Sequence, residues 1–138
     1  MAAEVEDLQA MWLDLKAHVD ELASERQQYL EIFEHSSEAY VVTDALGMIR
    51  DANGAAVDIL QRRKRFLRGK PLAVLVALEH RPEFRRRLGA LAQGNGAERS
   101  WRTVFESPRV RTAVTLTARP IERTDGIAGL CWLLQTEQ

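Results

Sequence analysis

The sequence predicts an α+β fold, in which a long amphipathic N-terminal helix precedes a domain of antiparallel strands with helices between them. Residues 1–35 contain neither Gly nor Pro and space their apolar side chains three or four residues apart, which is the period of a helix. Residues 110–121 alternate between two faces, which is the period of a strand. Residues 127–134 are apolar on both faces, as expected for a central strand that is covered on both sides.

Length and composition limit both the architecture and the function. The chain has 138 residues, of which 46% are hydrophobic and 28% charged, as in one globular domain with an appended element. No run approaches the roughly 18 apolar residues of a membrane span, and the N-terminus lacks the basic start and apolar core of a signal peptide. Because Cys131 is the only cysteine, an internal disulfide and a multi-cysteine metal site are excluded. We therefore expect a cytoplasmic protein without a membrane partner.

The net charge of −1 conceals two oppositely charged segments. Residues 1–35 carry nine acidic and two basic side chains, a net charge of −7, whereas residues 62–88 carry ten basic and two acidic ones, a net charge of +8. The overall balance excludes a polycation built for nucleic acid, so nucleic acid is not an expected partner. The Arg-rich segment is interpreted as solvated helix surface. An anion site, a partner site and docking against the acidic helix stay open as alternatives.

The acidic helix carries a heptad pattern in which two positions of every seven, a and d, form one narrow stripe. Eight of the nine stripe positions are apolar, and the ninth is Arg26, a polar residue at an a position that lowers stability while fixing register. The stripe predicts a homodimer through a coiled coil. The alternative is a cap that packs on its own domain, and both can hold together. Few opposite charges flank the stripe, so parallel and antiparallel pairing stay open. The predicted dimer interface consists of Val5, Leu8, Trp12, Leu15, Val19, Leu22, Arg26 and Tyr29.

Turn and capping signals set the remaining elements in order. Asp44 and Gly47 delimit a natural turn, which makes the two flanking strands a hairpin. Asn53 has the side chain of an N-cap, and Pro82 suits the first turn of a longer helix. The expected elements are strands at 39–43 and 48–52, helices at 54–60 and about 82–94, and strands at 99–106, 110–121 and 127–134.

An ordered set of short motifs runs through the first half of this domain, namely Phe33, Ala39–Val42, Asp44, Gly47, Ile49, Asn53, Ala55, Ala56 and Gly69–Leu72. Residues 80–105 then read as a long helix and a following strand, and Leu116 and residues 127–134 fit two closing strands. In this order the motifs resemble the PAS domain, the sensory fold of bacterial signalling proteins. The resemblance covers roughly residues 28–137.

The resemblance implies a five-stranded antiparallel sheet with helices on one face around a small central cavity. It divides the chain into a dimerisation helix over residues 1–35 and a PAS domain over residues 36–138. It implies a non-catalytic sensory or regulatory module in bacterial signal transduction or transcription regulation, which binds a small ligand in the cavity. One alternative is a ligand-free adaptor for protein–protein interaction, and another is a haem- or flavin-binding sensor of gas or redox state.

The cofactor is left unknown, because PAS domains bind haem, flavin or a small metabolite, or bind nothing. Haem-binding members supply a proximal His in a pattern like His-Pro-Glu-Tyr. Here Arg81 occupies the matching position and His80 lies one residue earlier, about 100° around a helix, which makes His80 a weak haem-ligand candidate. The light-sensing branch uses a cysteine on the central helices, so Cys131 on the last strand is interpreted instead as a small buried hydrophobe. The side chains expected to line the cavity are Phe66, Phe84, Trp101, Leu116, Leu130 and Trp132.

The other short motifs receive structural interpretations. Residues 35–38 are expected in a turn, His18 in solvent, and residues 94–99 in a loop that lacks the third glycine of a dinucleotide site. No carboxylate pair has a spacing that commits it to acid–base chemistry, so no enzymatic activity is expected. Gln135-Thr136-Glu137 replaces the Asp-Ile/Val-Thr triplet with which PAS domains lead into an effector, so a signalling partner or effector is expected in another chain.

Overall fold

The computed structural model describes residues 2–94 and 99–136 and divides into two compact units, Met1–Phe33 and Glu34–Gln138. The first unit is a single element, because the helix α1 spans Ala2–His35 without a break. At 1.5 Å per residue this helix is roughly 50 Å long. In a single chain the predicted stripe is exposed to solvent. Its apolar members are each more than half exposed: Val5, Leu8, Trp12, Leu15, Val19, Leu22 and Tyr29.

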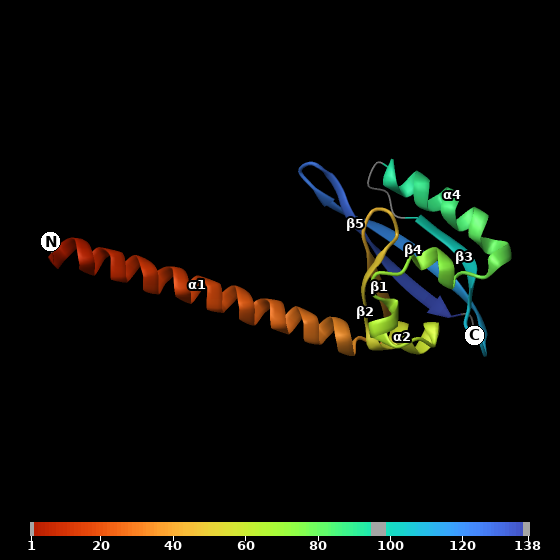
Figure 1. Ribbon diagram of the computed structural model, residues 1–138, viewed down its shortest axis with the longest axis horizontal. Helices are drawn as coiled ribbons and strands as arrows, with labels where there is room; N and C mark the ends of the chain where they lie inside the picture. The colour runs from red at the N-terminus through yellow and green to blue at the C-terminus, as the bar shows by residue number, and fades with distance from the viewer. Residues whose placement is uncertain (1, 95–98, 137–138) are drawn as a thin grey trace. The chain divides into compact units, whose positions relative to one another are not determined.

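The second unit is built on one antiparallel sheet with the strand order β2-β1-β5-β4-β3 (Figure 1). The last strand lies in the middle, paired with β1 on one side and with β4 on the other. The five-stranded antiparallel sheet and the central position of the last strand are thereby confirmed. The strands are β1 Ala39–Thr43, β2 Ile49–Ala52, β3 Arg99–Glu106, β4 Arg111–Arg123 and β5 Gly126–Thr136.

Three strands differ from the sequence prediction at their ends: β2, β4, which spans Arg111–Arg123 instead of 110–121, and β5, which spans Gly126–Thr136 instead of 127–134. The second strand begins at Ile49, because Met48 forms an isolated bridge to Pro71 instead of pairing with the sheet. The fourth strand continues to Arg123, where it pairs with Gly126 in a hairpin with β5. Of the predicted loop at 94–99, residues 95–98 lie outside the described residues, as does Glu137 at the end of the chain.

Helices cover one face of the sheet. Their buried side chains and the inward side chains of the strands form a single apolar cluster, so one core serves the whole unit. The N-cap of α2 is Asn53, as predicted, and Pro82 lies in the first turn of α4. The elements are α2 Gly54–Leu60, α3 Lys64–Leu67, the 3-10 turns η1 Leu72–Leu75 and η2 Leu78–His80, and α4 Arg81–Ala92.

Each edge strand of the sheet also bonds to another segment of the chain. The Ile49 N–H on β2 donates to Lys70 O at 2.8 Å, and the Gly69 N–H donates back to Ile49 O at 2.8 Å. At the other edge, the Ala77 N–H donates to Val104 O on β3 at 2.8 Å. Because an open strand edge invites pairing with another chain, these bonds shorten the open part of each edge.

Asn53 joins three parts of the unit. Its Oδ1 accepts from the Ala56 N–H at 3.1 Å and from the Tyr40 N–H at 3.0 Å, and its Nδ2 donates to Glu38 O at 2.8 Å. The side chain is fully buried. It therefore caps α2 and also holds the start of β1 in place. A hydrophobic residue here would leave several buried backbone groups without partners.

We predict that Asn53→Ala lowers the free energy of unfolding by about 2–3 kcal/mol, from the lost N-cap together with the unpaired buried groups. Urea denaturation followed by circular dichroism measures this loss. Gln93→Ala is the control, because Gln93 is exposed at the end of α4 and should change stability by less than about 0.5 kcal/mol. Equal unfolding midpoints for the two variants would contradict the role of Asn53.

Candidate functional site

The interior of the second unit contains three aromatic rings in mutual contact. The centroids of Phe84 and Trp132 lie 5.4 Å apart in a stacked arrangement, and those of Trp101 and Trp132 lie 5.8 Å apart edge to face. Phe84 and Trp101 complete the set at 6.2 Å. Phe84 and Trp132 are fully buried, and Trp101 is nearly so. We call Phe84, Trp101 and Trp132 the aromatic cluster.

A hydrogen bond fixes the orientation of the central ring. The Trp132 Nε1–H on β5 donates to Thr43 Oγ1 on β1 at 2.9 Å, and this hydroxyl donates to Asp44 O at 2.9 Å. Both side chains are fully buried. Because the indole N–H has a partner, the ring can lie in the core without the penalty of an unpaired donor.

Five of the six side chains expected to line a cavity belong to the buried core, and the aromatic cluster packs among them. The expectation for Phe66 is wrong, because its side chain is 51% exposed and lies beneath the Arg65 guanidinium, 4.8 Å from the ring centroid. Helix α3 is a single turn with room for one inward side chain, and Leu67 takes that place. The buried members are Phe84, Trp101, Leu116, Leu130 and Trp132.

Haem does not fit the arrangement. His80 ends the 3-10 turn η2, none of whose residues is buried, and its side chain is half-buried. Haem ligation would require this imidazole to reach an interior space wide enough for a macrocycle, whereas the three buried rings of the aromatic cluster lie in mutual contact there. We derive no chemistry through haem.

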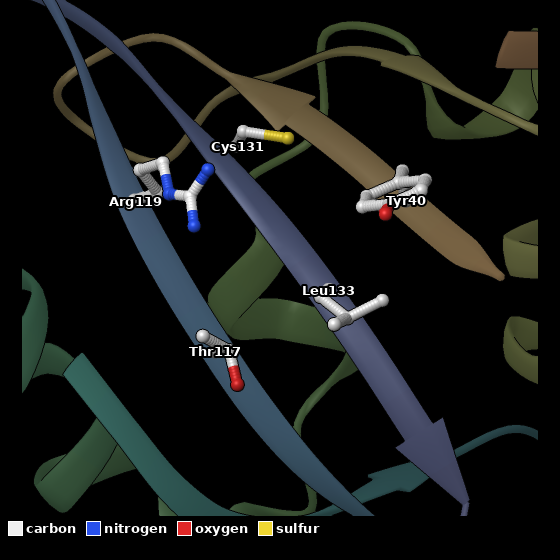
Figure 2. Close-up of a pocket in the computed structure, with 5 residues that line it drawn as sticks. All are labelled: Tyr40, Thr117, Arg119, Cys131 and Leu133. Carbon is white, nitrogen blue, oxygen red and sulfur yellow. The ribbon is translucent and has the colours of Figure 1, made fainter. Parts of the chain in front are cut away.

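The opposite face of the sheet carries a shallow hollow of about 110 Å³ (Figure 2). It is formed across three strands, since Leu133 on β5 pairs with Tyr40 on β1 and with Thr117 on β4, and Arg119 pairs with Cys131. This grouping is not evident from the sequence. Alternation marks the outward side chains, but only the register of the three strands brings these five together.

Two titratable groups of this hollow are held in their neutral forms. The hydroxyl of Tyr40 donates to Glu38 Oε2 at 2.7 Å, and this hydrogen bond, with some burial, raises the pKa of Tyr40. Burial raises the pKa of the Cys131 thiol, and the positive charge of Arg119 offsets only part of that rise. Cys131 is half-buried on the outer face instead of lying in the core as predicted, and its raised pKa argues against a nucleophilic role.

An ion-pair network gathers around Lys64 on α3. The Lys64 Nζ lies 2.9 Å from Glu34 Oε2 and 2.9 Å from Asp51 Oδ1, and Arg68 lies 3.6 Å from Asp51. Burial alone would lower the pKa of Lys64, but the hydrogen bonds to Asp51 and Glu34 outweigh it, so the pKa lies above its usual value. The network connects the last turn of α1 to α3 and β2.

The Arg-rich segment is only partly solvated surface. Arg81 donates from Nε to Val76 O at 2.9 Å and thereby braces the chain before α4. Arg87 lies 3.0 Å from Glu83, and its guanidinium lies 5.1 Å from the Trp101 ring centroid. The docking of this segment on the acidic helix stays a prediction.

A family model described as the PAS fold matches residues 33–136, which is more than half of the chain. The chain belongs to the PAS-fold family. Comparison with curated protein sequences gives no match.

Three solved structures illustrate the PAS fold that the chain shares. The PAS domain of an HTR-like protein from Haloarcula marismortui has a TM-score of 0.75 at 14% identity, over 88% of this chain and 99% of that one. A PAS domain from Colwellia psychrerythraea has a TM-score of 0.72 at 17% identity, over 80% and 95%. The PAS domain of a LuxR-family transcriptional regulator from Burkholderia thailandensis, in complex with ethanol, has a TM-score of 0.64 at 17% identity, over 78% and 96%. These matches establish the architecture.

Among the helices of the described residues, none combines the length and hydropathy that crossing a bilayer requires.

We predict that Thr43→Val lowers the free energy of unfolding by about 1–3 kcal/mol, because it leaves the Trp132 N–H buried without an acceptor. Chemical denaturation followed by tryptophan fluorescence measures the change. Thr117→Val is the matched control on the outer face, where the hydroxyl lies 3.2 Å from that of the exposed Ser100, and it should cost less than about 0.5 kcal/mol. A Thr43→Val loss no larger than the control would refute a structural role for this hydrogen bond.

Proposed function

We propose that this chain is a non-catalytic sensory or regulatory PAS module that forms a homodimer through the stripe on α1. The observation that carries the proposal is the stripe itself, seven apolar side chains at a and d positions that are each more than half exposed. An apolar side chain that moves from water into a helix interface contributes roughly 1.5–3 kcal/mol when it is fully buried. A second copy of α1 buries the same stripe on both chains, which is the arrangement of a two-stranded coiled coil.

The Lys64 network supplies a route between the domain and the helix. Glu34 in the last turn of α1 shares Lys64 with Asp51 on β2, so a displacement of α3 or β2 alters the support of that turn. In a paired helix, such a change becomes a shift of register or crossing angle. A signalling partner or effector in another chain then responds to the altered dimer, as in signal transduction or transcription regulation.

A small ligand in the interior is the signal that this mechanism would use. The Burkholderia PAS domain was solved in complex with ethanol, so a domain of this fold accommodates a small organic molecule. In the present chain, such a ligand would have to displace part of the aromatic cluster, and the core would change shape as it bound. The side chains around the ligand would be Leu116, Leu130 and the aromatic cluster itself.

A ligand-free adaptor is the second candidate function, and the packing of the aromatic cluster favours it. Three buried rings with centroids 5.4–6.2 Å apart occupy the interior that a ligand would need. An adaptor uses the same dimer and the same network, with contact by a partner in place of a ligand.

We expect native mass spectrometry of the freshly purified full chain to distinguish these candidates. A stoichiometric small molecule retained by the dimer supports the sensor, whereas a dimer with the mass of two bare chains supports the adaptor. A visible absorption spectrum of the same sample tests for haem and flavin. A Soret band would show that haem does fit the domain, and a band of either cofactor would contradict both candidate functions.

We predict that the full chain is a dimer at about tens of micromolar and that Leu15→Glu converts it to a monomer, because a charge at a d position cannot be buried in the seam. Light scattering coupled to size exclusion measures the mass. Ala17→Glu adds the same charge at an f position, away from the stripe, and should leave the dimer intact. A monomeric wild-type chain, or a dimer that survives deletion of residues 1–27, would contradict dimerisation through α1.

A further inference from the structure

A second hollow, of about 260 Å³, lies between the junction of α2 with α3 and the turn that joins β3 to β4. Among the residues that the structure describes, its lining includes two arginines, Arg62 and Arg109, and no acidic residue. The other lining residues are Gln61, Ser107 and Pro108. This hollow is separate from the aromatic cluster, from the outer-face hollow and from the Lys64 network.

The chain positions Arg62 by an abrupt change of direction. Gln61 ends α2 in the left-handed conformation, with φ 55° and ψ 39°, and its N–H closes the helix on Val57 O at 2.9 Å. The side chain of Gln61 is also engaged, donating to Asp58 O at 2.6 Å. This turn takes Arg62 out of the helical path, so that it faces the β3–β4 turn instead of continuing along α2.

The Nε of Arg62 is buried and has no hydrogen-bond partner within the part of the chain that the structure describes. The Nε–H of a guanidinium is an obligatory donor, and a buried donor without an acceptor costs free energy. An acceptor in the hollow would relieve this cost once the Arg62 side chain turned its Nε–H toward it. The orphaned donor thus distinguishes Arg62 from a solvated surface arginine.

Arg109 approaches from a rigid turn. The Ser107 N–H donates to Val110 O at 2.8 Å, and the Val110 N–H donates to Ser107 Oγ at 3.2 Å, so both ends of the turn are fixed. Pro108 removes one further degree of freedom from the backbone. In residues 2–94 and 99–136, no carboxylate forms an ion pair with Arg62 or Arg109, whereas Lys64, Arg87 and Arg111 each have at least one such partner.

We propose that this hollow binds the phosphate group of a small anion. Arginine donors match the oxygens of phosphate in geometry, and two of them converging on one concave space provide donors on two sides. The guanidinium of Arg62 donates to one phosphate oxygen, and that of Arg109 donates to another. Nucleic acid is a poorer match, because a single small hollow in a chain of net charge −1 lacks the extended basic surface that follows a phosphate backbone.

Two-dimensional NMR of the full chain, observing the arginine Nε–H groups, tests the proposal. Inorganic phosphate should shift the Arg62 and Arg109 signals in a saturable manner, while chloride at equal ionic strength should not. Ribose 5-phosphate is titrated in parallel. Equal affinity for the two ligands identifies free phosphate as sufficient, and tighter binding of the sugar phosphate identifies a phosphate monoester as the ligand.

Variants distinguish the contribution of arginine hydrogen-bond geometry to phosphate binding from the contribution of positive charge. Arg62→Gln and Arg109→Gln should each weaken phosphate binding by about tenfold or more, because each removes a charge-assisted hydrogen bond. Arg85→Gln makes the same change of charge on the exposed surface of α4 and should alter the affinity less than about twofold. Arg62→Lys keeps the charge but loses the Nε–H, and should also weaken binding. A shift without saturation, an equal loss in Arg85→Gln, or undiminished binding in Arg62→Lys would each overturn the proposal.

Discussion

The burial of Trp132 is the constraint on which the second unit depends. Its ring stacks on Phe84 from α4 and meets Trp101 from β3, and its N–H bonds to Thr43 on β1. One side chain of the central strand therefore holds together the helical layer, the far edge of the sheet and the neighbouring strand. At 25 cal/mol per Å², the burial of a Trp side chain contributes about 4–6 kcal/mol, a large part of the stability of a small domain.

The tight packing of the aromatic cluster affects both candidate functions, the sensor and the adaptor. Because protein cores are packed as densely as crystals, a ligand enters this one only by moving rings that also support the sheet and α4. A sensor of this kind would respond strongly to a small ligand, since occupancy and rearrangement of the core are the same event. An adaptor would keep the cluster unchanged and use its rigidity to present α1 and the surface of the domain to a partner.

The roles of the basic side chains differ according to whether a hydrogen-bond acceptor or a carboxylate lies nearby. Lys64 and Arg87 form ion pairs with carboxylates inside the domain, and Arg81 donates hydrogen bonds to backbone carbonyl groups. Arg62 and Arg109 face a hollow whose lining, among the residues that the structure describes, has no acidic residue. The basic character of residues 62–88 is thus divided between internal bracing, solvated surface and one concave place suited to an anion, and net charge alone could not separate these roles.

The sequence by itself determined the features that depend on near neighbours: the helix and stripe of α1, the turn closed by Gly47, the Asn53 cap and the central character of the last strand. These follow from periodicity and capping, which act over about four residues. The tertiary structure alone decided that Phe66 lies in solvent, because a one-turn helix has a single inward position and Leu67 occupies it. It also decided which face carries Cys131, which carboxylates Lys64 meets and that Arg62 and Arg109 converge. Such outcomes depend on strand register and on contacts between distant segments, which no local pattern of side chains specifies.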